Sequence, residues 1–263
     1  MLPLELLDRI ACFETLRAYE GKVFCLSEHL ERLADSCKGI DRVPPLKKTE
    51  LKRWVMRVLK ESAFPNARLR LSVHWINEHE GILLLMVWNF KQHPKTWYEK
   101  GVDLSTTTVK RWTLRAQDPQ LKSSMFVSGV LAVLDQGDRD AHEIIFLNQD
   151  GTVSEGTVSN IFMVKGKRLL TPGVSSGILR GVTRGTVIGL AKKRGLEVSE
   201  TVLSRHELYN ADECFMTNTS SEVLPVVSLD GRRIADGRPG PITRTLGKDF
   251  KAHLRKTLGI KLI

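Results

Sequence analysis

The sequence has no apolar stretch long enough to cross a membrane as a helix. The longest uninterrupted apolar run covers residues 82–88, whereas a helical span needs about 20 apolar residues. The first residues also lack the basic segment and apolar core of a secretion signal. We therefore expect a protein that is neither embedded in a membrane nor secreted.

Cysteine is scarce, and its spacing excludes a disulfide scaffold. The chain lacks a CxxC pair and a Cys/His cluster, and its four cysteines are widely spaced: Cys12, Cys25, Cys37 and Cys214. Disulfide scaffolds and zinc sites need denser patterns than this. We interpret the four residues as reduced thiols of a cytoplasmic protein and expect no metal site.

Positive charge exceeds negative charge but is not concentrated. Lys and Arg number 40 against 30 Asp and Glu, which gives a net charge of +10. Clustered positive charge would favour nucleic-acid binding. Here basic pairs such as Lys47-Lys48 and Lys192-Lys193 are interrupted by acids, and no RNP, zinc-finger or helix-turn-helix signature accompanies them. A basic nucleic-acid-binding protein is therefore only a remote alternative.

The composition is that of a folded globular protein, with 41% hydrophobic and 27% charged residues. Residues 13–19 and 22–25 flank Glu20-Gly21 and predict a hairpin. A helix is expected next, with Ser27 as its N-cap. The periodicity then predicts a helix over 48–62 and strands over 68–76, 82–90 and 102–109.

Polar residues 115–120 predict a linker, beyond which strands and helices alternate. The expected helices cover 124–135, 183–194 and 243–258, and the expected strands cover 143–147, 160–165 and 213–217. The helix over 183–194 should end at Gly195. We therefore predict an α+β protein with two unequal domains: a small domain over 1–113, a linker over 114–120 and a large domain over 121–263.

Four parts of the chain carry a pattern that is specific in its order and spacing. They are residues 13–33 (FETLRAYEGKVFCLSEHLERL), 120–125 (QLKSSM), 151–162 (GTVSEGTVSNIF), and the pair 177–184 (GILRGVTR) with 215–226 (FMTNTSSEVLPV). Together they resemble the class IV aminotransferases, which include branched-chain aminotransferases, D-amino-acid aminotransferases and aminodeoxychorismate lyases. The resemblance implies a homodimeric fold-type IV enzyme that uses pyridoxal 5′-phosphate, with a smaller N-terminal α/β domain and a larger domain with a β-barrel-like core.

Two residues match the chemical centre of that family. Lys122 matches the lysine whose amine bonds to the cofactor aldehyde and, once displaced, carries a proton at the substrate α-carbon. Glu155 matches the acid that faces the pyridine nitrogen, where a carboxylate favours the protonated, electron-accepting ring. Taken alone, Lys122 would be interpreted as a surface lysine and Glu155 as a turn residue.

Other matches concern the phosphate and the ring of the cofactor. The resemblance implies that Arg32 offers a guanidinium fork, that Val182 and Thr183 offer groups at a helix amino end, and that Thr219 adds a hydroxyl. Leu179 matches the apolar residue that packs on the ring. Without the resemblance, Arg32 could be a surface arginine, Thr183 a helix cap and Leu179 a core residue.

For the substrate, the resemblance implies backbone amides at Ser220-Ser221 and the arginine at Arg70, although alternating arginines on an exposed strand explain Arg70 as well. Phe13 lies where D-amino-acid enzymes carry tyrosine, which argues against that specificity. Val127 replaces an aromatic residue that is frequent in branched-chain enzymes. The chain also begins almost at the first motif, so we expect an abbreviated start of the small domain.

The expected activity is transfer of an amino group between an amino acid, with a branched-chain one favoured, and a 2-oxo acid such as 2-oxoglutarate. Residues 219–222 and 236–244 resemble the transaminases, whereas Thr217-Asn218 resembles some lyases. Two alternatives therefore stay open. One is an aminodeoxychorismate lyase that yields 4-aminobenzoate and pyruvate, and the other is a D-amino-acid aminotransferase.

Overall fold

The computed structural model describes residues 10–77, 80–111, 118–137 and 141–261. It separates into two units. The first contains the described parts of 1–92, 120–126 and 254–263, and the second those of 93–119 and 127–253. Each unit is described in turn.

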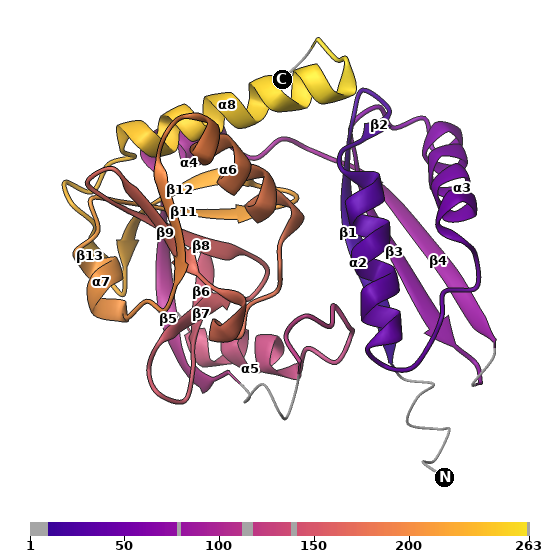
Figure 1. Cartoon of the computed structure of the whole chain (residues 1–263), viewed down its shortest axis with the longest axis horizontal. Helices are drawn as coiled ribbons and strands as arrows, with labels where there is room; N and C mark the ends of the chain where they lie inside the picture. Colours follow the sequence, from indigo (N-terminus) through magenta and orange to yellow (C-terminus); the bar gives the residue numbers. More distant parts are fainter. Residues whose placement is uncertain (1–9, 78–79, 112–117, 138–140, 262–263) are drawn as a thin grey trace. The chain divides into compact units, whose positions relative to one another are not determined.

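The first unit is built on an antiparallel sheet of order β2-β1-β3-β4 (Figure 1). Its strands are β1 (Ala11–Tyr19), β2 (Lys22–Val23), β3 (Ala67–Trp75) and β4 (Gly81–Asn89). The turn between β1 and β2 needs positive φ at both central residues, 46° at Glu20 and 72° at Gly21. The expected hairpin and the strands near 68–76 and 82–90 are therefore confirmed.

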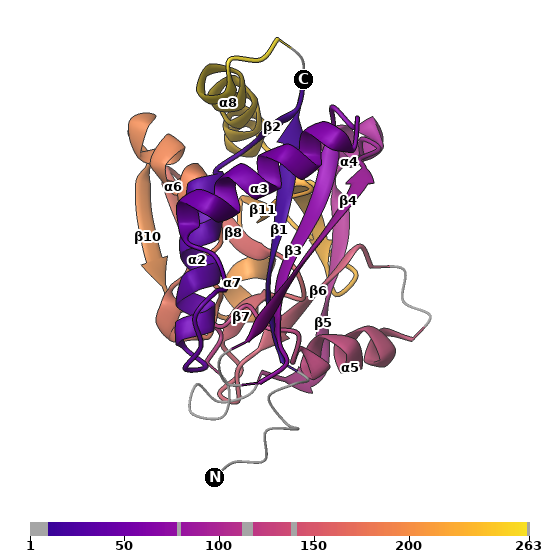
Figure 2. The ribbon, with the colours of Figure 1, turned by 90° about the vertical axis from the view of Figure 1, so that its right-hand side faces the viewer.

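Two helices, α2 (Leu26–Lys38) and α3 (Lys48–Glu61), cover one face of this sheet (Figure 2). Apolar residues three or four positions apart form one stripe on each helix and pack on alternate residues of the strands. The core that results includes Leu30, Leu33, Leu51, Val55, Leu16, Leu69 and Leu71. The helix expected over 48–62 is confirmed.

The start of α2 corrects one prediction. Ser27 was expected to cap this helix, but the N-cap is Cys25, with a left-handed φ of 49°. The first helical hydrogen bond runs from the His29 amide to the Cys25 carbonyl at 3.1 Å. Leu26 is buried in the core, so the helix has already begun before Ser27.

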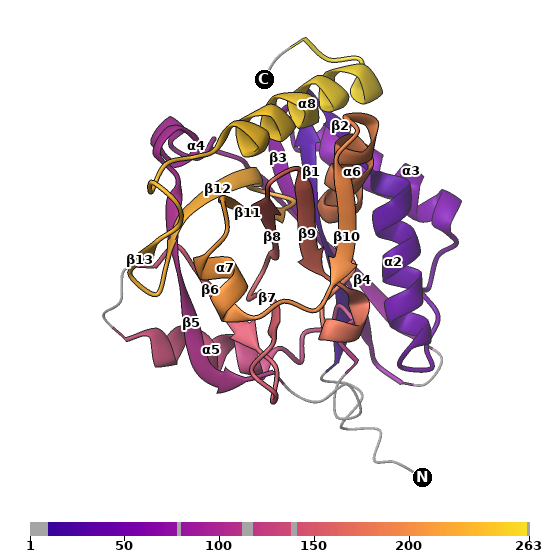
Figure 3. The same cartoon turned by 60° about the vertical axis from the view of Figure 1, so that its left-hand side comes forward.

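The second unit contains a mixed sheet of order β10-β9-β8-β11-β12-β5-β6-β7, with β13 paired to β12 (Figure 3). Its strands are β5 (Val102–Lys110), β6 (Glu143–Leu147), β7 (Val153–Gly156), β8 (Asn160–Lys165), β9 (Arg168–Pro172), β10 (Glu197–Thr201), β11 (Glu213–Asn218), β12 (Glu222–Leu229) and β13 (Arg232–Arg233). The sheet forms a half-barrel, and with the helices it makes an α+β fold, as expected.

Helices accompany this sheet. They are α4 (Lys95–Lys100), α5 (Val127–Gln136), the short 3-10 helix η1 (Val174–Ser176), α6 (Val182–Lys193) and α7 (Arg205–Tyr209). The part of α8 (Pro241–Leu258) up to residue 253 also belongs to this unit, and its last residues belong to the first unit. The glycine after α6, Gly195, has the expected positive φ of 75°. Within the described ranges, no helix has both the length and the apolar character needed to span a membrane.

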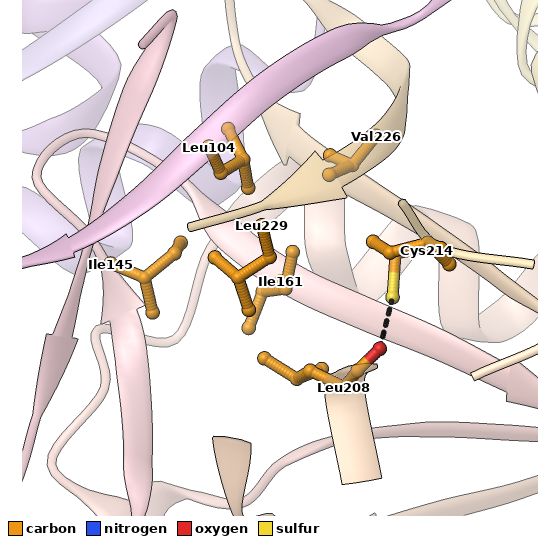
Figure 4. Close-up of a pocket in the computed structure, with 8 residues that line it drawn as sticks. Leu104, Ile145, Ile161, Leu208, Cys214, Val226 and Leu229 are labelled. Carbon is orange, nitrogen blue, oxygen red and sulfur yellow. Dashed lines mark hydrogen bonds between the residues drawn. The ribbon is translucent and has the colours of Figure 1, made fainter. Parts of the chain in front are cut away.

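The inside of the half-barrel is a packed apolar core, drawn in Figure 4. It is lined by Leu104, Ile145, Ile161, Leu208, Cys214, Val226, Leu229 and Ile234. The Cys214 thiol donates a hydrogen bond to the Leu208 carbonyl at 3.9 Å. Burial, helped by the neighbouring Glu213, raises the pKa of this thiol. Cys214 is therefore a neutral core residue, and this interior is lined by apolar groups that suit packing and not a polar ligand.

The two units do not follow the expected domain boundaries at 113 and 121. The segment over 102–110 belongs to the second unit because β5 pairs with β12 and β6. The segment over 120–126 belongs to the first unit because the Phe13 amide donates to the Lys122 carbonyl at 2.9 Å. The Ser124 amide likewise donates to the Ala11 carbonyl at 2.7 Å, and α5 begins at Val127 instead of at Ser124.

Candidate active site

The segment that carries Lys122 is fixed by backbone hydrogen bonds on both sides. The Lys122 carbonyl accepts a hydrogen bond from the Phe13 amide at 2.9 Å, and its amide donates to Ser36 Oγ at 3.1 Å. Ser123 next to it forms a β-bridge with Cys12. The main chain at Lys122 is therefore anchored to β1 and α2, which leaves only the side chain to move.

The ring of Phe13 lies beside two cationic groups. Lys122 Nζ is 4.9 Å from the ring centroid and Arg70 Cζ is 3.7 Å from it. Burial, together with the charge of nearby Arg68, lowers the pKa of Arg70. Aromatic faces stabilise cations at such distances. The structure thus places Arg70 and Lys122 against the ring of Phe13, and all three residues were predicted from sequence.

Arg32 is bound by an acid that the sequence did not single out. Its Nε and Nη2 donate to the two oxygens of Glu14, each at 2.7 Å, and His29 Nδ1 lies 2.7 Å from Glu14 Oε2. Complete burial acts to raise the pKa of Glu14, but Arg32 and His29 outweigh it and lower the pKa to about 2. Arg32 was predicted to bind the phosphate, and two of its donors therefore already bind the carboxylate of Glu14.

In the second unit, Glu155 on β7 is held by three donors. Its Oε1 accepts from Arg111 Nη2 at 2.7 Å. Its Oε2 accepts from Asn160 Nδ2 at 3.0 Å and from the Leu179 amide at 2.9 Å. Arg111 and Glu155 are both nearly buried, with side-chain exposures of 11% and 9%. This geometry orients the carboxylate far more tightly than a surface turn would.

The loop between Glu155 and Asn160 is fixed by a buried acid, Glu143. Glu143 Oε1 accepts from the Thr157 amide at 3.0 Å, and Oε2 accepts from Ser159 Oγ at 3.2 Å. Gly156 has no room for a side chain, because a Cβ there would overlap Ser159 Oγ. The β7–β8 loop therefore holds Glu155 and Asn160 at a constant spacing.

Helix α6 begins without a side-chain cap. Its N-cap is Gly181, and Val182 and the buried Thr183 occupy the first positions. An uncapped helix amino end exposes backbone amides that suit an anion. Nearby in the same unit's sheet, the buried Thr217 Oγ1 has no hydrogen-bond partner within the described part of the chain.

In the turn between β11 and β12, the amides predicted to bind the substrate are bonded within the chain. The amides of Ser220 and Ser221 both donate to Asn218 Oδ1, at 2.9 and 2.7 Å, and Tyr98 Oη donates to the Ser221 carbonyl at 3.3 Å. Because Asn218 occupies these amides, a carboxylate must first displace its side chain. Thr219 lies on the same turn and is half-buried.

Sequence reasoning missed four residues that support this site: Glu14, Arg111, Asn160 and Asn218. Glu14, Asn160 and Asn218 lie within matched motifs, so a polar residue inside each motif was the signal that could have been followed; Asn218 was noted there only for its resemblance to some lyases. Arg111 follows β5 and shows no such signal, because its partner Glu155 is distant in the sequence.

Comparison with known proteins identifies the relatives of the chain. The family model described as amino-transferase class IV matches residues 11–229. A Methanocaldococcus jannaschii protein with the provisional name branched-chain-amino-acid aminotransferase is 38% identical over 261 residues, which covers 95% of this chain and 88% of that protein. A D-alanine aminotransferase of Listeria monocytogenes is 31% identical over 94% of this chain and 88% of its own length.

Solved structures have the same fold. The branched-chain amino acid aminotransferase of Escherichia coli superimposes with a TM-score of 0.87 at 30% identity, over 92% of this chain and 84% of that one. The corresponding enzyme of Thermobaculum terrenum, solved in its PLP-bound holo form, superimposes with a TM-score of 0.84 at 27% identity, over 94% of this chain and 85% of that one. The fold of the described residues is therefore shared with an enzyme that was solved with this cofactor.

Replacing Glu14 with Gln should destabilise the protein at neutral pH by about 3–5 kcal/mol, because Arg32 then loses its charged partner in a buried site. The folded-state pKa of Glu14 is depressed from 4.5 to about 2. Its stabilisation is thus complete above pH 4.5 and is lost as the pH falls toward 2. Urea unfolding at several pH values should show this loss in the wild type and not in Glu14→Gln.

The matched control is Glu31→Gln. Glu31 pairs with Lys48 on the surface, where ion pairs contribute little. Its unfolding free energy should stay within about 1 kcal/mol of the wild type. An unchanged acid dependence in Glu14→Gln would contradict the role assigned to the Glu14 cluster.

Proposed function

Because this chain belongs to the class IV aminotransferase family, we propose that it transfers an amino group between a branched-chain amino acid and a 2-oxo acid such as 2-oxoglutarate. The chain is an aminotransferase, and its cofactor is pyridoxal 5′-phosphate. The branched-chain preference is supported by the names of its relatives. The proposal rests above all on the match of Lys122 to the reactive lysine of the family and on its amine lying over the ring of Phe13.

The residues of the second unit fit this cofactor. Its phosphate is a dianion, and the uncapped amino end of α6 with Thr183 offers the amides and hydroxyl that such a group needs. The buried Thr217 hydroxyl, which lacks a partner in the described chain, supplies a further donor that sequence reasoning did not include. Glu155 supplies the anion that a protonated ring nitrogen needs.

When bound, the cofactor draws electrons from the substrate α-carbon. Lys122 would hold the cofactor through its amine, and its Nζ would move a proton at the substrate α-carbon. Glu155 keeps a proton on the ring nitrogen, and Arg111 and Asn160 keep Glu155 in place. Val182 and Thr219 would bind the phosphate, and Leu179 would contact the ring. Arg32, whose Nε and Nη2 bind Glu14, would have to exchange these donors to join them.

The substrate carboxylate is bound by Arg70, with Phe13 as the neighbouring wall. Arg70 and Lys122 both contact the ring of Phe13, and a guanidinium binds a carboxylate with two parallel hydrogen bonds. The amides of Ser220 and Ser221 contribute after Asn218 has turned away. D-amino-acid transfer is the second candidate, because the D-alanine aminotransferase of Listeria monocytogenes is 31% identical to the chain.

A substrate panel tests the reaction. We expect purified holoenzyme to form L-glutamate from 2-oxoglutarate with L-leucine, L-isoleucine or L-valine, and to give little product with D-alanine. Chiral chromatography of the glutamate reports the handedness. D-glutamate from D-alanine alone would select the D-amino-acid enzyme. Pyruvate and 4-aminobenzoate from aminodeoxychorismate without amino transfer would select the lyase.

Replacement of Lys122 by Ala should abolish turnover and the covalent attachment of the cofactor, because the only amine assigned to this bond is removed. After borohydride reduction, mass spectrometry should find the reduced cofactor on Lys122 of the wild type and on no residue of the variant. Lys60→Ala removes an exposed lysine of α3 and is the control, with activity unchanged. Full turnover by Lys122→Ala would refute the proposed mechanism.

The resemblance also supports a cytoplasmic homodimer as part of the proposal. Light scattering should give twice the chain mass of 29.6 kDa. Thiol titration of the unfolded protein should find Cys12, Cys25, Cys37 and Cys214 all reactive, since the structure has all four as free thiols. A monomeric mass would contradict the dimer, and missing thiols would contradict a reducing compartment.

A further inference from the structure

We propose that Asn160 is a positioning residue that couples the carboxylate of Glu155 to the amino end of α6. The inference rests on the proposed function, in which Glu155 serves the ring nitrogen of the cofactor and α6 serves its phosphate. Through Asn160, the acid that serves the ring nitrogen and the helix end that serves the phosphate are held in a fixed arrangement.

The amide nitrogen of Asn160 joins two segments. Nδ2 donates to Glu155 Oε2 at 3.0 Å and to the Leu179 carbonyl at 3.0 Å. The Leu179 amide returns a hydrogen bond to the same Glu155 oxygen at 2.9 Å. These three bonds form a closed ring among Glu155, Asn160 and Leu179. Asn160 is buried, so water does not compete strongly for them.

The oxygen of Asn160 lies against the start of α6. A Cβ at Gly181, the N-cap, would overlap Asn160 Oδ1 and come within 3.3 Å of Arg184 Cβ. The backbone φ of Gly181 is −65°, which any residue can adopt. Glycine is therefore needed at this position for space and not for conformation. The two sides of one side-chain amide thus contact Glu155 and the loop that leads from Leu179 into α6.

The neighbouring bonds make this arrangement rigid. Ser154 Oγ, next to Glu155, donates to the Gly177 carbonyl at 2.8 Å and anchors the start of the loop that leads to α6. Glu143 fixes the β7–β8 loop on the other side. An aspartate at position 160 would offer no N–H donor and would place a second negative charge beside Glu155. The site therefore requires an amide at this position.

The coupling predicts that replacing Asn160 weakens binding of both the ring and the phosphate of the cofactor. We would measure dissociation constants for pyridoxal 5′-phosphate and for pyridoxal, which lacks the phosphate. Asn160→Ala should weaken pyridoxal 5′-phosphate binding by about 10- to 100-fold, the range expected when buried hydrogen bonds are lost. The preference for the phosphorylated form should also fall several-fold, because the amino end of α6 shifts.

Glu155→Gln is the comparison for the ring end. It removes the charge of Glu155 and keeps a side chain of the same size. It should weaken both ligands by a similar factor and leave the phosphate preference unchanged. Asn210→Ala, at an exposed asparagine of the same unit, should change neither constant.

A double-mutant cycle tests the contact itself. Gly181→Ala alone should weaken binding as Asn160→Ala does, because the new Cβ pushes the amide away from Glu155. In the Asn160→Ala background, Gly181→Ala should weaken cofactor binding much less than it does alone, since Asn160 Oδ1 is absent. Equal losses in both backgrounds, or an unchanged phosphate preference in Asn160→Ala, would overturn the coupling.

Failure of the proposed function and failure of the coupling give different results. If the wild type does not bind pyridoxal 5′-phosphate, the proposed function fails. If the wild type binds it and the cycle is additive, only the coupling fails. Should Asn160→Ala not fold by thermal unfolding of the apoprotein, Asn160→Ser takes its place, with the same loss of phosphate preference expected and an unchanged preference counting against the proposal.

Discussion

The carboxylate of Glu155 is the group on which the organisation of the second unit's site depends. A nearly buried anion must be satisfied by donors, and here Arg111, Asn160 and the Leu179 amide supply them. Each donor comes from a different stretch of chain. Satisfying one charge therefore determines where β7, the loop before α6 and the end of β5 meet.

The first unit also contains a buried acid, Glu14, but its charge serves to hold the fold together. Glu14 is buried and binds Arg32 and His29, so its charge is used to fix α2 on β1. The cations of Arg70 and Lys122 lie beside the ring of Phe13, and an aromatic face stabilises a cation without neutralising its charge. Because Phe13 and Glu14 are consecutive residues of one strand, their side chains point to opposite faces of it. One face of β1 thus supports structure while the other supports the proposed chemistry.

Regular periodicity made much of the fold predictable. β3 alternates buried and more exposed residues, and α3 repeats its apolar residues at helical spacing, so both could be located from sequence. The strands β7, β9 and β12 were not predicted. β5 itself was predicted, but its place in the second unit was not, since its partners β12 and β6 follow much later in the chain.

The sequence by itself determined the family and pointed to Lys122 and most of the candidate ligands, because these depend on residue type and order along the chain. Only the tertiary structure decided that Arg32 is held by Glu14, that Asn218 occupies the amides of Ser220 and Ser221, and that Asn160 joins Glu155 to α6. Hydrogen bonds are short-ranged and directional. Which donor meets which acceptor therefore depends on how distant segments pack, and no local pattern records it.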